Sequence, residues 1–164
     1  MATLLELEKS GDIFRLDPHL DPGQQEYRLF YTSATLKKWI EDDLPKLGSD
    51  RNIEELPNQQ FDSLVEVYAS GDTLTFGWTF KPLTNIGAGV WEFKTADLRI
   101  FGWFHKKDCF VGAFSDEKWR IQQHSLYRGY AGQTVHFCNT LALDQPKFID
   151  GVDPNDVVSN YAYP

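Results

Sequence analysis

The chain has 164 residues, of which 41% are hydrophobic and 15% aromatic, and its formal net charge at pH 7 is −8. This composition can build a packed core, so it excludes wholesale disorder, and the length suits one domain. No apolar run approaches the length of a membrane-spanning helix, and the first residues lack the basic and apolar parts of a secretory signal. We therefore expect a cytoplasmic protein without membrane contact.

Charge is distributed unevenly along the chain. Residues 81–128 carry eight Lys or Arg and five Asp or Glu, a net charge of +3, whereas the flanking segments are acidic. A strongly acidic protein repels polyanions at long range, while a locally basic face keeps contact with phosphate possible. The middle segment is therefore where we expect a functional face.

The cysteines and histidines form no metal or disulfide motif. Cys109 and Cys138 are far apart, and no His or Cys stands at a spacing typical of zinc ligands. We expect two reduced core cysteines, no metal site and no cofactor.

The first half of the chain predicts a strand followed by two helices. Residues 26–32 are rich in β-forming side chains and predict the strand. Ser33 is placed to cap a helix over 34–47, and Pro45 should stop or kink that helix near its end. A second helix is expected over 59–69. Both helices place apolar residues at i, i+3 and i+4, namely Leu36, Trp39 and Ile40 in the first and Phe61, Leu64 and Val65 in the second.

The second half predicts a run of strands. Alternating apolar residues predict a strand over 73–80, and three more are expected over 90–94, 98–104 and 109–114. The last three are joined by loops short enough for hairpins, so they should be antiparallel neighbours. A turn is expected at 115–117. Two further helices are expected, at 131–141 and at 153–158, where Asp153 and Pro154 form a capping pair. Gly129 and Gly132 should interrupt any helix around LYRGYAGQ, residues 126–133.

Two helices that precede a meander of strands indicate an α+β domain with an antiparallel sheet. We expect the helices to pack across one face of the sheet and to leave the other free for a ligand or partner. Residues 26–120 would form the core of a single domain over 1–164, with 1–25 and 121–164 as terminal extensions.

An aromatic stripe runs through the predicted strands and allows two interpretations. It could stack nucleobases, or it could form the core that the helices cover. Its members are Phe76, Trp78, Phe80, Trp91, Phe93, Phe101, Trp103 and Phe104.

The segment FKPLTNIGAGVWEFKTADLRIFGWFHKKDCFVGAF, residues 80–114, resembles the RelE/HigB-like toxin superfamily, including its phage-derived members. The strand–helix–helix order before it also matches that layout, so the resemblance spans about 26–120. It implies a RelE-like protein of a toxin–antitoxin or phage-related system. The implied activity is metal-independent cleavage of mRNA, and the implied partners are an antitoxin protein and RNA or the ribosome.

The resemblance also implies site residues. Lys94 and Arg99 stand where the family places basic residues in its hairpin strands, and Lys118 and Arg120 follow the third strand. As catalytic residues, these four would offset charge that builds up on the phosphate during attack by a 2′-hydroxyl. RNA contacts are expected from the hairpin tip, residues His105, Lys106 and Lys107.

Other interpretations of the same residues remain open. Arg99 could form a cross-strand ion pair with Glu92 or Asp97, and Lys106 and Lys107 could be solvated turn residues. The whole chain could be a non-catalytic interaction or regulatory module on the same scaffold, which its acidic balance favours. A small-ligand-binding fold with a different strand order is a third possibility.

Overall fold

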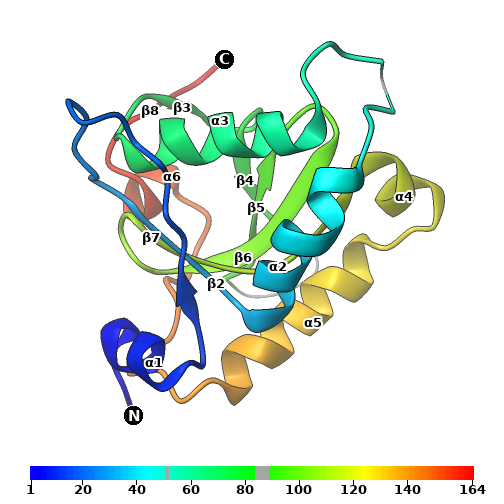
Figure 1. The fold of residues 1–164 in the computed structure, drawn as a ribbon. Coiled ribbons are helices and arrows are strands. Elements are labelled where there is room, and N and C mark those ends of the chain that lie inside the picture. Colours follow the sequence, from blue (N-terminus) through cyan, green and yellow to red (C-terminus); the bar gives the residue numbers. More distant parts are fainter. Residues whose placement is uncertain (51, 84–88) are drawn as a thin grey trace.

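The computed structural model describes residues 1–50, 52–83 and 89–164 and shows a mixed α+β fold (Figure 1). The helices are α1 (Leu4–Ser10), α2 (Ala34–Lys38), α3 (Pro57–Ala69), α4 (Lys118–Gln123), α5 (Tyr127–Thr140) and α6 (Pro154–Val157). The strands are β1 (Phe14–Arg15), β2 (Leu29–Thr32), β3 (Leu74–Thr75), β4 (Phe80–Pro82), β5 (Trp91–Lys94), β6 (Leu98–Lys106), β7 (Cys109–Glu117) and β8 (Tyr161–Ala162).

Six of these strands form one sheet in the order β1-β2-β7-β6-β5-β4. The predicted meander is confirmed, because β5, β6 and β7 are consecutive antiparallel neighbours. Strand β2 adds to the sheet parallel to β7, after a crossover through α2 and α3. Strands β3 and β8 form a separate parallel pair. The α+β class with a mostly antiparallel sheet is therefore confirmed.

The first two predicted helices are also confirmed. The Ser33 hydroxyl accepts a hydrogen bond from the amide of Leu36 and caps α2, as its position in the sequence indicated. The chain continues through a wide helical turn over Trp39–Asp43 (η1) and a 3₁₀ turn over Leu44–Lys46 (η2), where Pro45 ends the helical region. Helix α3 begins two residues earlier than predicted, with Pro57 in its first turn.

The expectation that helices cover only one face of the sheet is wrong. Helices α2 and α3 pack on one face, where the rings of Tyr68 and Phe93 lie 5.3 Å apart. Helix α5 packs on the opposite face, where Tyr130 stacks on Phe101 at 5.3 Å (Figure 1). Every residue of β6 except Lys106 is buried. A sheet that is apolar on both faces needs a helical layer on each, and α5 supplies the second.

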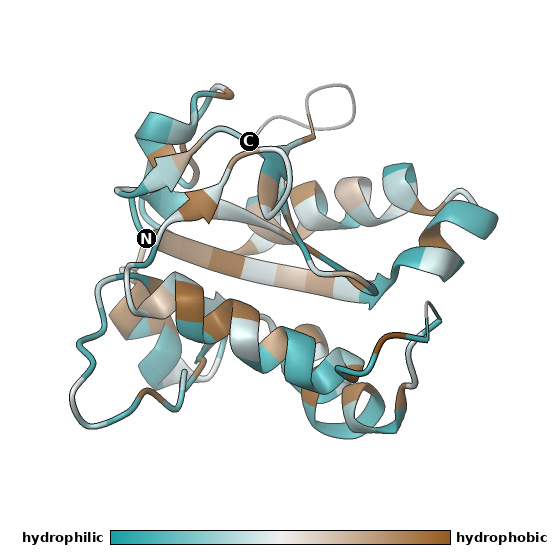
Figure 2. Cartoon of the chain, turned by 90° about the horizontal axis from the view of Figure 1, so that it is seen from above, coloured by the Kyte–Doolittle hydropathy of each residue, from teal (hydrophilic) through white to brown (hydrophobic). Residues whose placement is uncertain are grey.

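Figure 2 shows the same arrangement by hydropathy. The long strand that crosses the middle of the molecule is apolar or neutral along most of its length, while the surrounding helices and loops carry hydrophilic stretches. The core therefore lies on both sides of the β6–β7 pair.

Three local predictions are wrong. Residues 73–80 do not form one strand, because Gly77, at φ +88°, turns the chain between β3 and β4. Residues 115–117 belong to β7 and not to a turn. Gly129 and Gly132 lie inside α5, where a Cβ would meet no atom within 4 Å. Tertiary packing of α5 offsets the helix propensity that these glycines lose, about 1 kcal/mol each.

The two terminal segments meet each other on the fold. Ala2 pairs with Leu143, and α1 contributes Leu4 and Leu7 to a cluster with Cys138 of α5. The short helix α6 begins as predicted, with the Asp153 carboxylate accepting from the amide of Asn155. In the described parts of the chain, no helix is long and apolar enough to cross a membrane.

Candidate functional site

The register of the sheet brings four charged residues onto the face that α5 covers. Lys81 of β4 lies opposite Glu92 of β5, and Lys94 of β5 lies opposite Arg99 of β6. Side chains alternate between the faces of a strand, so Glu92 and Lys94 lie on the face opposite to Trp91 and Phe93. The hydroxyl of Tyr127 on α5 accepts a hydrogen bond from the Nε of Arg99, and Tyr127 therefore completes the group. We call Lys81, Glu92, Lys94, Arg99 and Tyr127 the Glu92 cluster.

Glu92 is fully buried, and neither carboxylate oxygen has a hydrogen-bond partner within the described ranges. The nearest cation is Lys81, whose Nζ lies 3.7 Å from Oε1, which is an ion pair but too long for a hydrogen bond. Buried carboxylates are normally paired and hydrogen-bonded, because leaving them without partners costs free energy. Glu92 is therefore the least satisfied group on this face.

Burial raises the pKa of Glu92 above its ordinary value, and the charge of Lys81, followed by those of Arg99 and Lys94, opposes the rise. A raised pKa means that the protein favours the protonated carboxyl of Glu92 more than water does. A carboxylate with a raised pKa is a stronger base once it is ionised, which is a property of catalytic groups.

Arg99 is only 6% exposed, and its guanidinium contacts mainly backbone. Its Nη1 donates to the carbonyls of Thr95 and Leu98 at 2.7 and 2.8 Å, and its Nε donates to the Tyr127 hydroxyl at 3.2 Å. Among described residues, no carboxylate lies within ion-pair distance of Arg99, and Asp97 instead accepts from Gln60. The alternative of an ion pair with Glu92 or Asp97 is therefore wrong.

Lys94 and Tyr127 show the effect of the same environment. The Lys94 ammonium donates to the carbonyl of Gly77 at 3.0 Å, and burial, followed by the charge of Arg99, lowers the pKa of Lys94. Burial, followed by the charge of Glu92, raises the pKa of Tyr127. The cluster therefore holds a base, Glu92, whose pKa is raised, beside an acid, Lys94, whose pKa is lowered.

The other two predicted catalytic residues lie at the edge of this group. Lys118 is close enough for its charge to lower the pKa of Lys94. Arg120 pairs with Asp116 at 3.3 Å, and Asp116 also accepts from the Tyr130 hydroxyl at 2.6 Å. Arg120 is therefore held in a separate polar group one strand away, on β7 and α4.

The predicted RNA-binding residues lie at the far end of β6. Lys106 lies seven positions after Arg99 in an extended strand, a distance of roughly 23 Å at about 3.3 Å per residue. His105 is buried, and its Nδ1 lies 3.0 Å from the carbonyl oxygen of Lys147. Lys107 is exposed in the turn. The seven predicted site residues thus form two groups at opposite ends of the hairpin.

His105 and Lys106 help to line a separate cavity of about 400 Å³, together with Tyr31, Cys109 and Asp144. Burial raises the pKa of the Cys109 thiol, which makes it a poor nucleophile at neutral pH. Both cysteines are free thiols. In residues 1–50, 52–83 and 89–164, no three His, Cys, Asp or Glu side chains are grouped to hold a metal.

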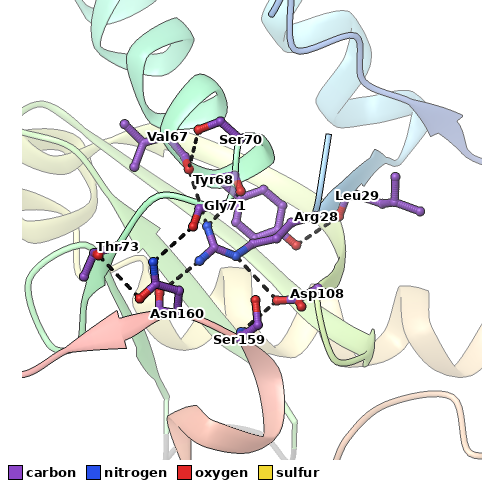
Figure 3. A network of polar contacts seen from close by, with 10 residues as sticks. All are labelled: Arg28, Leu29, Val67, Tyr68, Ser70, Gly71, Thr73, Asp108, Ser159 and Asn160. Atoms are coloured by element: carbon purple, nitrogen blue, oxygen red, sulfur yellow. Dashed lines mark hydrogen bonds and ion pairs between the residues drawn. The ribbon is translucent and has the colours of Figure 1, made fainter. Parts of the chain in front are cut away.

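A second buried arginine, Arg28, was not singled out by the sequence. Its Nη1 donates to the carbonyl of Tyr68 at 2.8 Å, its Nη2 donates to that of Asn160 at 2.9 Å, and its Nε lies 3.4 Å from Asp108 (Figure 3). Asp108 in turn accepts from the amide of Ser159. This network ties β2, the end of α3, the β6–β7 turn and the C-terminal segment together, and we assign it a structural role.

Comparison of the chain with protein-family models, curated proteins and solved structures finds no match. The functional assignment therefore depends on the geometry of the Glu92 cluster. Sequence reasoning named Lys94 and Arg99 but treated Glu92 only as an ion-pair partner. The signal that could have found it is a single carboxylate between two aromatic residues, Trp91 and Phe93, in a short strand.

Proposed function

We propose that this protein is a RelE-like, metal-independent endoribonuclease of a toxin–antitoxin or phage-related system, with the Glu92 cluster as its active site. The observation that carries the proposal is a fully buried carboxylate without a hydrogen-bond partner among the described residues, beside Lys81, Lys94 and Arg99. Such an arrangement combines a base with cations that can stabilise a phosphate.

The chemistry would proceed without a cofactor. Arg99 and Lys81 hold the phosphate, and Glu92 accepts the proton of the adjacent ribose 2′-hydroxyl. The 2′-oxygen attacks phosphorus, and the bond from phosphorus to the 5′-oxygen breaks as Lys94 supplies a proton to that oxygen. The products are a 2′,3′-cyclic phosphate and a 5′-hydroxyl.

Access to Glu92 follows from the position of Lys81. The side chain of Lys81 is 44% exposed, whereas that of Glu92 is fully buried. A phosphate at the surface competes with Glu92 for Lys81, because it offers a second anion to the same ammonium. Binding of RNA would therefore withdraw Lys81 from Glu92. Because Glu92 is fully buried, its contact with a 2′-hydroxyl also requires this face of the sheet to open next to Lys81.

A second function, a non-catalytic interaction module, is favoured by two observations. The net charge of −8 opposes encounter with RNA. The guanidinium of Arg99 also donates to two backbone carbonyls, as a structural arginine would. In this case the cluster would support the fold, and the protein would act through its surface.

Glu92→Gln is the variant that separates the two functions. It keeps the size of the side chain and removes the base, so we expect loss of RNA cleavage by at least about 100-fold, within the usual contribution of a general base. Arg99→Ala is less informative, since it leaves the carbonyls of Thr95 and Leu98 without their donor. The matched control is Asp62→Asn, which removes an exposed carboxylate on α3.

The assay has two parts. Regulated expression in a bacterial host is followed by growth, and purified protein is tested on labelled RNA, alone and with translating ribosomes. Growth arrest and cleavage by the wild type and Asp62→Asn, but not by Glu92→Gln, support the nuclease. A substrate with a 2′-deoxy nucleotide at the cleavage position should stay intact. Normal growth and intact RNA with the wild type would favour the interaction module.

A further inference from the structure

The members of the aromatic stripe differ in how far the fold exposes them. Six of them are at most 1% exposed and form the core, which supports packing over base stacking for those residues: Phe80, Trp91, Phe93, Phe101, Trp103 and Phe104. Trp78 is different, because 69% of it is exposed. A tryptophan offers a large aromatic surface, so its exposure leaves a stacking face available.

The backbone around Trp78 is held in a tight turn. The amides of Trp78 and Thr79 donate to the carbonyl of Thr75 at 3.2 and 2.8 Å, and the amide of Gly77 donates to that of Phe80 at 2.8 Å. Every one of these hydrogen bonds closes within the turn. The indole is therefore presented from a fixed backbone, which lowers the entropy lost when a ligand stacks on it.

A second exposed ring, from the C-terminal segment after β8, lies beside this turn. Tyr163 is 66% exposed, and its ring lies 5.7 Å from that of Phe76. Phe76 packs edge-on against Phe80, and its amide donates to the carbonyl of Ala162 at 2.9 Å, which anchors the C-terminal strand β8. We call Phe76, Trp78 and Tyr163 the aromatic patch: the rings of Phe76 and Tyr163 are in contact, and Trp78 follows Phe76 by two residues in the turn.

The aromatic patch is joined to the Glu92 cluster through Lys94. The ammonium of Lys94 donates to the carbonyl of Gly77, the residue before Trp78, and its amide donates to the carbonyl of Thr79, the residue after it. A cavity of about 290 Å³ opens beside this turn, lined by Thr79, Lys94, Thr95 and residues of α3 such as Leu64. Aromatic surface, a cation and a cavity therefore occur together around Lys94, with the cavity on the side of the sheet that α3 covers.

We propose that the aromatic patch stacks the bases of single-stranded RNA, with Trp78 carrying the base next to the phosphate that the Glu92 cluster would hold. Proteins that bind single strands combine cations along the backbone with aromatic side chains on which bases stack. Lys81 and Lys94 supply the cations here. A protein partner would not require cations at this point, whereas a phosphodiester does. The inference rests on the proposed function, but it can be tested without catalysis.

The test uses the full chain and a 2′-O-methyl RNA oligonucleotide, which cannot be cleaved by attack of a 2′-hydroxyl. Binding is measured by fluorescence anisotropy of the labelled oligonucleotide and by quenching of tryptophan fluorescence. Of the other tryptophans, Trp91 and Trp103 are buried, and Trp39 and Trp119 are partly buried. Quenching by a stacked base should therefore come mainly from Trp78.

Trp78→Ala is expected to weaken binding roughly 10-fold and to remove the quenching, in the range found for loss of one stacking side chain. Trp78→Phe keeps an aromatic face and should restore most of the affinity. Tyr27→Ala is the matched control, because Tyr27 is 61% exposed and packs over Gly71, six residues before Gly77. It should bind as the wild type does.

Equal binding by the wild type and Trp78→Ala, or no binding by the wild type, overturns the inference. A concentration-dependent dimer that Trp78→Ala abolishes would assign the patch to a second copy of this chain and would also overturn it. Stacking and cleavage are separable. Wild type that binds the oligonucleotide through Trp78 but cuts no RNA removes the nuclease and keeps the patch, while cleavage unaffected by Trp78→Ala removes the patch alone.

Discussion

The molecule contains two buried arginines whose surroundings differ. Arg28 is fully buried, donates to the carbonyls of Tyr68 and Asn160, and has a carboxylate, Asp108, at 3.4 Å. Arg99 also donates to carbonyls, but the carboxylate in its cluster, Glu92, has no hydrogen-bond partner in the described structure. In the first arrangement Nη1 and Nη2 of the guanidinium have hydrogen-bond partners and only Nε has none, whereas in the second neither oxygen of the carboxylate has one.

This difference shows which buried charge serves structure and which is available for function. A fold that buries a carboxylate without partners loses stability, and such losses are tolerated mainly where the group has another role. Burial lowers the pKa of Arg28 and raises that of Glu92, so burial acts on both groups. The charge of Asp108, 3.4 Å away, is the largest contribution that opposes the change in pKa at Arg28, whereas at Glu92 the largest opposing charge is Lys81 at the longer distance of 3.7 Å, followed by Arg99 and Lys94.

The largest effect is expected from Arg28→Leu. The change removes the donors to two carbonyls and leaves Asp108 without its cation, so we expect a loss of about 3–5 kcal/mol in the free energy of unfolding. Denaturation in urea, followed by circular dichroism, measures it. The control is Arg15→Leu, which breaks an ion pair with Glu26 at a side chain that is 42% exposed and should cost about 0–1 kcal/mol. Similar losses in the two variants would contradict the structural role of Arg28.

The second prediction concerns the pH dependence of stability at Glu92. Because the folded pKa of Glu92 is raised above its unfolded value, the folded state binds more protons between the two values, and this group makes stability fall as pH rises through that window. Glu92→Gln cannot ionise, so it should be more stable than the wild type at neutral pH. The difference should shrink as pH falls towards the unfolded pKa, near 4.5.

Denaturation curves of the wild type and Glu92→Gln at neutral pH and near pH 4 measure this difference. Asp62→Asn serves again as the control and should show no comparable change with pH. Lower stability of Glu92→Gln than of the wild type at neutral pH would mean that Glu92 has a structural role, as Arg28 does. The contrast between a structural and a functional buried charge would then be wrong.

The smallest effect is expected from Arg120→Ala. The Arg120 side chain is 43% exposed, and its ion pair with Asp116 should contribute below about 1 kcal/mol. Arg120 also lies outside the Glu92 cluster, so we expect RNA cleavage to fall much less than in Lys94→Met. Cleavage rates of the two variants, measured side by side on one labelled RNA, test this order. Equal losses would place Arg120 in the same site as Lys94.

The sequence determined most of the local structure. The hairpins of β5, β6 and β7 follow from short polar loops between apolar runs, and Ser33 and Asp153 cap their helices as their side-chain chemistry requires. The basic residues Lys94 and Arg99 were named as site residues, but their pairing across the hairpin was not predicted and follows from the register of the folded strands. All of these features depend on residues that are close in the sequence.

Only the tertiary structure showed that α5 covers the second face of the sheet, the face on which the Glu92 cluster lies. Residues Trp91, Glu92 and Phe93 are all buried, so the alternation that normally distinguishes core from surface is absent from β5. Glu92 loses its solvent only because α5, distant in sequence, packs over its face. Trp78 becomes exposed only because the chain turns at Gly77, and Arg28 is buried by the C-terminal segment. Local propensity determines where helices and strands form. Whether a charged side chain is buried depends on which distant segment of the chain packs over it.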